Sequence, residues 1–125
     1  MNNFLQTEET RQCHIAFPGT LNDHETVFGG LIMKWMDEVA YITATRFTRN
    51  KMVTVSVDSL RFLKPIQQGM IVELIGRVIY VGKVKLEVQV EIFSEDMFSE
   101  HREKTCEGKF IFAATDEQNR PQRIS

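Results

Sequence analysis

One carboxylate interrupts an apolar stretch of predicted helix, and it is the first candidate for chemistry. Asp37 has Met33, Ala40 and Tyr41 three or four residues away, which places apolar side chains around it on a helix. A carboxylate in apolar surroundings costs free energy unless it is paired, hydrogen-bonded or protonated. Such carboxylates are frequent in functional sites. The pattern leaves two interpretations open: Asp37 reacts, or it only bonds a loop amide or faces a solvated groove.

A pair of glycines precedes the same helix. The first turn of a helix has free N–H groups at the positive end of its dipole. Gly29 and Gly30 would let a ligand approach that backbone closely, and the N–H groups could stabilise the oxyanion of an acyl-transfer reaction. Alternatively, the two glycines only form a tight entry into the helix.

The segment before the helix carries further polar candidates. The amide of Asn22 can donate to a carbonyl and accept from water, or Asn22 is only a turn residue. His24 and His14 are possible bases, but their contexts favour a solvated loop residue and a strand residue. The chain has no G-x-S-x-G elbow, no Walker A sequence and no dinucleotide-binding G-x-G-x-x-G sequence.

Basic residues that could meet phosphates are scattered along the chain. They are Arg61, Lys64, Lys83 and Arg120, and each could equally be ordinary solvated surface. The two cysteines, Cys13 and Cys106, lack the spacing of metal ligands, which argues against a zinc site. We predict that both are reduced, half-buried strand residues.

The elements that must position these side chains follow from the hydrophobic period. Residues 9–16 can form a first strand, and 17–28 have the glycine, proline and asparagine of a loop. From Gly29-Gly30 to about Thr48 the apolar residues recur at helical spacing, on a face broad enough for a buried helix. Valines then alternate at 53, 55 and 57, and the apolar parity switches at Leu60. That switch predicts a bulge near Asp58-Ser59.

The rest of the chain alternates with period two. We predict strands over 70–81, 84–92 and 104–115, with a tight turn at Gly82-Lys83, a charged loop over 94–103 and a frayed tail from Asp116. One helix with a run of hairpin-linked strands predicts an α+β fold with an antiparallel sheet. The chain is expected to be one domain, 1–125, with an ordered core of about 8–117.

Composition narrows the classes of function. The net charge of −2 gives no general reason to bind nucleic acid. No apolar stretch approaches the length of a membrane span, so membrane insertion is not expected. The N-terminal residues lack the pattern of a signal peptide, and a cytoplasmic location is the expectation.

Taken together, these residues resemble a known family. Asn22, then Phe28, Gly29-Gly30 and Asp37-Glu38 resemble the acyl-CoA thioesterases of the hotdog superfamily, more narrowly the bacterial acyl-CoA hydrolases and brain-type cytosolic acyl-CoA hydrolase domains. The likeness continues at 53–66, Gly69, 81–83 and 110–116, and it covers about 8–121.

This resemblance implies a hotdog fold, in which an antiparallel sheet of five to six strands wraps around one long helix. It implies a homodimer as the minimal unit, with active sites between subunits, and often a trimer of dimers. Asn22 and Asp37 match the family's catalytic pair and would come from opposite subunits. One departure is that Val84 and Lys85 stand where the family usually has small hydroxyl residues.

The expected activity is hydrolysis of acyl-CoA to a fatty acid and coenzyme A. Asp37 would act as general base or nucleophile, and the Gly30 amide with Asn22 would stabilise the oxyanion. Candidates for substrate binding are Phe28, Gly29, Arg61, Lys64 and Lys83. No metal or bound cofactor is required, because coenzyme A belongs to the substrate.

Other functions remain open at this stage. One is a hotdog dehydratase or hydratase, which usually needs a catalytic histidine; His24 is the nearby candidate, and its context does not match. Another is a hotdog protein that binds acyl-CoA without turning it over, and a third is a purely structural oligomer.

Overall fold

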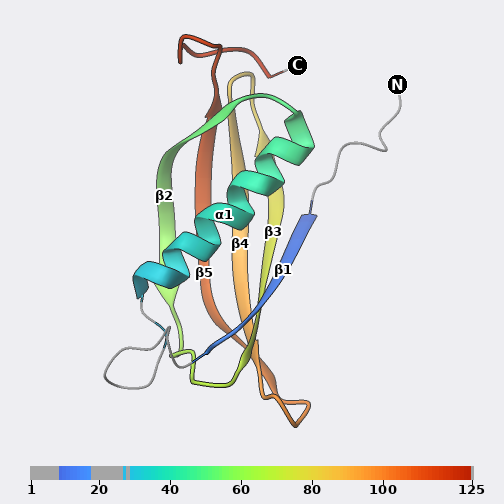
Figure 1. Ribbon diagram of the computed structural model, residues 1–125. Coiled ribbons are helices and arrows are strands. Elements are labelled where there is room, and N and C mark those ends of the chain that lie inside the picture. Colours follow the sequence, from blue (N-terminus) through green and yellow to red (C-terminus); the bar gives the residue numbers. More distant parts are fainter. Residues whose placement is uncertain (1–8, 18–26, 28, 125) are drawn as a thin grey trace.

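One helix lies across one face of a five-stranded sheet. The computed structural model describes residues 9–17, 27 and 29–124. Its elements are β1 (Glu9–Ile15), α1 (Gly29–Thr48), β2 (Met52–Phe62), β3 (Ile71–Val81), β4 (Lys85–Glu95) and β5 (Arg102–Ala114). All strand pairs are antiparallel, in the order β1-β3-β4-β5-β2 (Figure 1). The predicted α+β architecture is confirmed, with five strands.

The hairpin between β4 and β5 is longer than its sequence indicated. The ladder continues through Phe93↔Lys104 and Glu95↔Arg102, so only residues 96–101 connect the strands. The predicted charged loop over 94–103 is therefore wrong at both ends. Charged side chains occur in these strands because one face of the sheet is open to water.

The helix packs closely on the sheet. Its buried face includes Met36, Val39 and Thr43, which are fully buried. Gly76 on β3 lies directly below it, because a Cβ there would come within 2.5 Å of the Thr43 hydroxyl oxygen. This close approach fixes how far each flank of the helix stands from the strands beside it.

Strand β2 forms one edge of the sheet and is irregular. Its register with β5 shifts between Thr54 and Ser56 and again between Asp58 and Arg61, and Ser59 has a positive φ of 53°. The predicted bulge near Asp58-Ser59 is confirmed. The first two alternating valines of β2, Val53 and Val55, do not face the core and are 38% and 49% exposed.

The pairing of β2 explains this exposure. Thr54 pairs with Phe112, which is buried beneath the helix, so Thr54 faces the helix and its neighbours face away. After the first register shift the parity reverses, and Val57 pairs with the buried Phe110.

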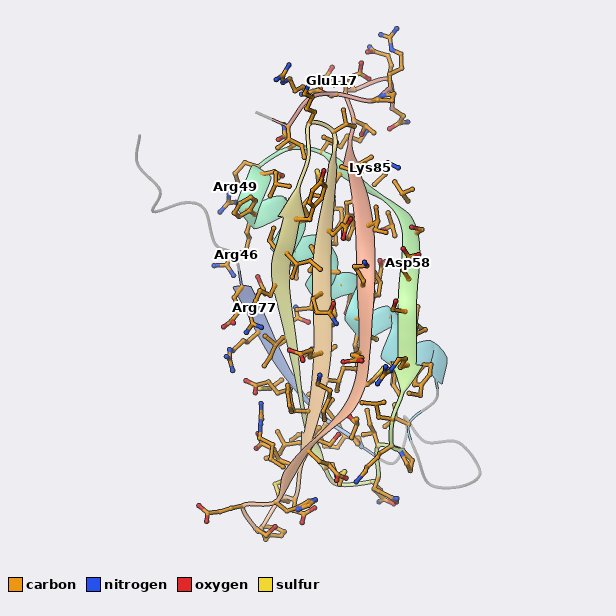
Figure 2. The ribbon with its side chains drawn as sticks, turned by 180° about the vertical axis from the view of Figure 1, so that it is seen from behind. Arg46, Arg49, Asp58, Arg77, Lys85 and Glu117 are labelled. Atoms are coloured by element: carbon orange, nitrogen blue, oxygen red, sulfur yellow. The ribbon has the colours of Figure 1, made fainter. Side chains whose placement is uncertain are left out.

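Within the described residues, no second layer covers the face of the sheet away from the helix (Figure 2), and ion pairs lie on that face. Arg102 bonds both Glu95 and Glu73, at 2.7 Å from the latter, and its guanidinium lies 4.5 Å from the centre of the Phe93 ring. Lys104 lies 2.6 Å from Glu91. Each exposed pair of this kind is worth about 0–1 kcal/mol, so this face is solvated surface more than a source of stability.

The C-terminal tail is docked, and the predicted fraying from Asp116 is wrong. Thr115 and Pro121 form an isolated antiparallel bridge, and the N–H of Gln122 donates to the carbonyl of Ala114 at 2.8 Å. The N–H of Ile124 donates to the carbonyl of Lys83 at 2.7 Å. The tail thus folds back beside the turn between β3 and β4.

Candidate active site

Asp37 has a specific partner on the edge strand. The hydroxyl of Thr54 donates to its carboxylate across 3.3 Å, from β2 to α1. Both side chains are exposed in the single chain. Apolar neighbours therefore do not bury Asp37 within one chain. The reason is that this flank of the helix lies beside β2, the edge strand of the sheet.

The sequence analysis missed Thr54. The alternation around it shows only a polar residue between valines, which is what any wet strand face would show. Its partner lies 17 residues earlier in the chain, on another element. A hydroxyl directed at a candidate catalytic carboxylate is visible only once the helix and strand are placed together.

The start of α1 is exposed, and no acidic side chain in its first turn offsets the positive end of the helix dipole. Gly29 and Gly30 are exposed, and an added Cβ at either position would meet nothing within 4 Å. Steric crowding within the chain therefore does not explain the glycines at these positions. A ligand that must approach the backbone closely would explain them.

Gly30 and Asp37 lie on one stripe of the helix, two turns apart. Seven residues at 1.5 Å each separate them by roughly 10 Å along the axis. A single carbonyl cannot contact both groups of the same chain. If both act on one thioester, the helix start must come from one chain and the carboxylate from another.

A hollow of about 390 Å³ adjoins the helix start. It brings together two of the predicted substrate-binding residues, Gly29 and Lys64, with apolar walls from Val27, Ile32, Phe62, Leu63 and Ile66. The Lys64 ammonium lies 2.8 Å from Glu103, and this hydrogen bond holds the pKa of the Glu103 carboxyl below its usual range. Lys64 is thus a cation on the rim of an apolar hollow.

The other predicted basic residues lie elsewhere. The Arg61 guanidinium is 3.3 Å from Glu107, and Lys83 is exposed in the β3–β4 turn. Lys64 and Lys83 therefore belong to different places on the chain. Asn22, His24 and Phe28 lie outside the described residues.

His14 and the two cysteines are not arranged for catalysis. The His14 ring stacks on Trp35, with centroids 4.3 Å apart, and burial lowers its pKa. Both cysteines are free strand residues, as predicted, but neither is half-buried: Cys13 is exposed and Cys106 is buried. Burial raises the pKa of the Cys106 thiol to about 11, so it stays protonated.

Among residues 9–17, 27 and 29–124, no three His, Cys, Asp or Glu side chains gather as metal ligands would. In that same part of the chain, no helix combines the length and the apolar character needed to cross a membrane.

Comparison with known proteins adds three findings. The model of the thioesterase superfamily matches residues 24–98. An uncharacterised acyl-CoA thioester hydrolase of Bacillus subtilis is 37% identical, with 94% of this chain and 73% of that protein aligned. The acyl-CoA hydrolase of Staphylococcus aureus, solved with butyryl coenzyme A, is 34% identical and superposes with a TM-score of 0.88, over 94% of this chain and 71% of that one.

Two further observations concern a hexameric relative and alanine variants of the S. aureus enzyme. An apo-hexameric acyl-CoA thioesterase superposes with a TM-score of 0.90 at 31% identity, over 94% of this chain and 75% of that one. Solved alanine variants of the S. aureus enzyme replace an asparagine, an aspartate and a threonine. The aspartate follows the asparagine by 15 residues and precedes the threonine by 17. The same spacings separate Asn22, Asp37 and Thr54.

Proposed function

This chain belongs to the thioesterase superfamily, and from that membership we infer an acyl-CoA thioesterase in which Asp37 is the reacting carboxylate. The enzyme hydrolyses acyl-CoA to a fatty acid and coenzyme A. Asp37 takes a proton from the attacking water, or attacks the thioester itself to form an anhydride that water then opens. In both routes the carbon–sulfur bond breaks and the thiolate leaves, needing little help from an acid.

The observation that carries this proposal is the hydrogen bond from Thr54 to Asp37. A hydroxyl donor holds the carboxylate in one orientation, in which it can act as base or nucleophile. The spacings shared with the residues changed in the S. aureus variants support the same pair.

The oxyanion is assigned to the helix start. We propose that the N–H of Gly30 donates to the thioester oxygen, with help from the amide of Asn22. The open space at Gly30 and the absence of acid in the first turn support this role. Oxyanion donors of this kind are worth roughly 10²–10³ in turnover.

The site requires two chains. The roughly 10 Å between Gly30 and Asp37 on one helix supports a homodimer in which each chain completes the site of the other. The free edge of β2, next to Thr54, is where a second chain would bring its helix start. The hexameric thioesterases that superpose on this chain support the further proposal of a trimer of dimers.

Substrate contacts beyond the reacting atoms are proposed for Phe28, Gly29 and Lys64 at the helix start. Lys83 is proposed at the far end of the sheet, and Arg61 stays a weaker candidate because Glu107 already engages it. The proposed chemistry needs no metal or cofactor. A cytoplasmic location remains a prediction.

The decisive experiment measures thiol release from short, medium and long acyl-CoAs, together with product analysis. Release of free coenzyme A by the wild-type chain and its loss in Asp37→Asn would support the proposal. Loss or gain of a double bond without thiol release would indicate a dehydratase or hydratase instead. Binding of acyl-CoA without turnover would indicate a non-catalytic binding protein.

A further inference from the structure

Two apolar side chains stand in solvent at the turn between β4 and β5. This turn ends the hairpin that extends past the other strands of the sheet (Figure 1). Phe98 at its tip is 97% exposed, and Met97 beside it is 39% exposed. Single exposed apolar residues are ordinary, whereas neighbouring ones mark interaction sites. Aromatic residues and methionine are also enriched in protein interfaces, so the pair is a candidate contact.

Hydrogen bonds hold the tip in one conformation. The N–H of Asp96 donates to the carbonyl of His101 at 3.1 Å, and the Ser99 hydroxyl donates to the Asp96 carboxylate at 2.9 Å. The N–H of His101 donates to the Ser99 hydroxyl oxygen at 3.2 Å. A turn held in this way loses little conformational entropy when it docks, so Phe98 is already presented for a contact.

A hollow of about 590 Å³ lies against the tip. Its walls come from the turn, at 96–99, and from the segment before β3, at 68–70. Among the described residues that line it, none is a cation, and its carboxylate, Asp96, already accepts a hydrogen bond from Ser99. The hollow therefore suits an apolar side chain better than a charged ligand.

The apolar surface continues onto the end of β1. The N–H of Ala16 donates to the carbonyl of Met70 at 3.0 Å, and the N–H of Gly69 donates to the carbonyl of Ala16 at 2.9 Å. These bonds place Phe17, which is 61% exposed, beside the segment that walls the hollow. We call this surface the apolar end, and it consists of Phe17, Met70, Met97 and Phe98.

The shape of the apolar end fits a second copy of the chain. It carries a protruding ring, Phe98, and a neighbouring hollow, so both halves of a contact lie on one surface. It lies at the ends of the strands, whereas the proposed dimer contact lies along the edge of β2. A trimer of dimers needs a further interface, and a head-to-tail contact that repeats three times closes a ring.

We propose that the apolar end joins one dimer to the next, with Phe98 of one chain seated in the hollow of a chain from the neighbouring dimer. This proposal rests on the trimer of dimers proposed above and names the surface that builds it. The reacting groups lie between the two chains of one dimer. The apolar end therefore contributes to assembly and not to the chemical step.

The test measures the mass of the assembly by analytical ultracentrifugation over a range of protein concentrations. We expect a hexamer for the wild-type chain. Phe98→Asp should raise the midpoint concentration of the equilibrium between dimer and hexamer at least about thirtyfold, as the loss of an interface anchor does. The resulting dimer should keep the wild-type kcat for thiol release. Gln68→Arg, on the opposite wall of the hollow, should also give dimers, whereas Phe98→Leu should stay hexameric.

The matched control is Ile79→Asp, which puts the same charge in place of a side chain that is 49% exposed near the far end of β3. It should leave the hexamer intact. A hexamer that persists in Phe98→Asp would overturn the proposal, and so would equal dissociation in the control.

A wild-type chain that stays a dimer at every concentration would also overturn the proposal. Flotation of that dimer with phosphatidylcholine vesicles would then show that a lipid surface covers the apolar end. A hexamer that releases no thiol from acyl-CoA would overturn the proposed function and leave the assigned interface standing. The two failures are therefore distinguishable.

Discussion

The two flanks of helix α1 carry adjacent carboxylates with different surroundings. Asp37 faces β2 and accepts a hydrogen bond from Thr54. Glu38, one residue on, lines a hollow of about 400 Å³ on the β1 side with His14 and Tyr41. Both carboxylates are exposed in the single chain, and both flanks border an edge strand of the sheet.

The difference teaches that position around the helix, more than residue type, decides which carboxylate can react. One residue turns a side chain by about 100°. That rotation gives Asp37 a hydroxyl donor and the same flank as Gly30, whereas Glu38 lines a hollow with His14, whose ring stacks on Trp35. Four changes test this contrast, from the largest expected effect to the smallest.

Asp37→Ala should lower kcat by about 10³-fold, because it removes the base or nucleophile. Glu38→Ala, at the adjacent position, should keep kcat within about twofold of wild type, as exposed residues outside a site usually do. Thiol release at saturating acyl-CoA measures both. Comparable losses in the two variants would remove the distinction between the flanks.

Gly30→Ala should lower kcat by about 10²-fold, because a methyl group would keep the thioester oxygen from the backbone N–H. The same change should raise the free energy of unfolding by up to about 1 kcal/mol, since alanine favours a helix and the space is open. Gly76→Ala is the control with the opposite outcome: its Cβ would meet the Thr43 hydroxyl, which destabilises by about 1–3 kcal/mol. Thermal unfolding beside turnover separates the two.

Thr54→Ala should lower kcat about 10–10²-fold, in line with the loss of a hydrogen bond to a charged group. Thr54→Ser retains the hydroxyl and should recover most of the activity, whereas Ser56→Ala, two residues along β2, should change little. If serine restores nothing, the role of Thr54 lies in packing and not in its hydrogen bond to Asp37.

On the β1 flank, the expected effect is on stability alone. Burial lowers the pKa of His14, so the unfolded chain binds a proton more readily than the folded one. The contribution of neutral His14 to the free energy of unfolding is fully present above the ordinary histidine pKa of about 6.5. It is lost as the pH falls below that value. His14→Phe should therefore flatten the decline in Tm below pH 6.5 and leave kcat unaltered. An identical decline in the variant would place the titrating group elsewhere.

Local patterns in the sequence were sufficient for the elements and for part of the site. Helical spacing from Gly29 and period-two alternation after Met52 predicted the helix and the strands, because each element buries one face along its own length. The unusual position of Asp37 and the glycines before the helix could also be seen in the sequence. The parity switch at Asp58-Ser59 correctly predicted a bulge.

Contacts between distant segments were decided only by the tertiary structure. The proposed role of Thr54 depends on a carboxylate that lies on another element. The position of the C-terminal tail depends on backbone hydrogen bonds to Lys83 and Ala114. Burial at the edge strand likewise depends on pairing with β5, which local alternation does not contain. The hydrophobic period of the sequence shows which residues share a face of an element. The packing of the helix on the sheet determines which residues that face contacts. The candidate carboxylate could therefore be read from the sequence, but its hydroxyl partner could not.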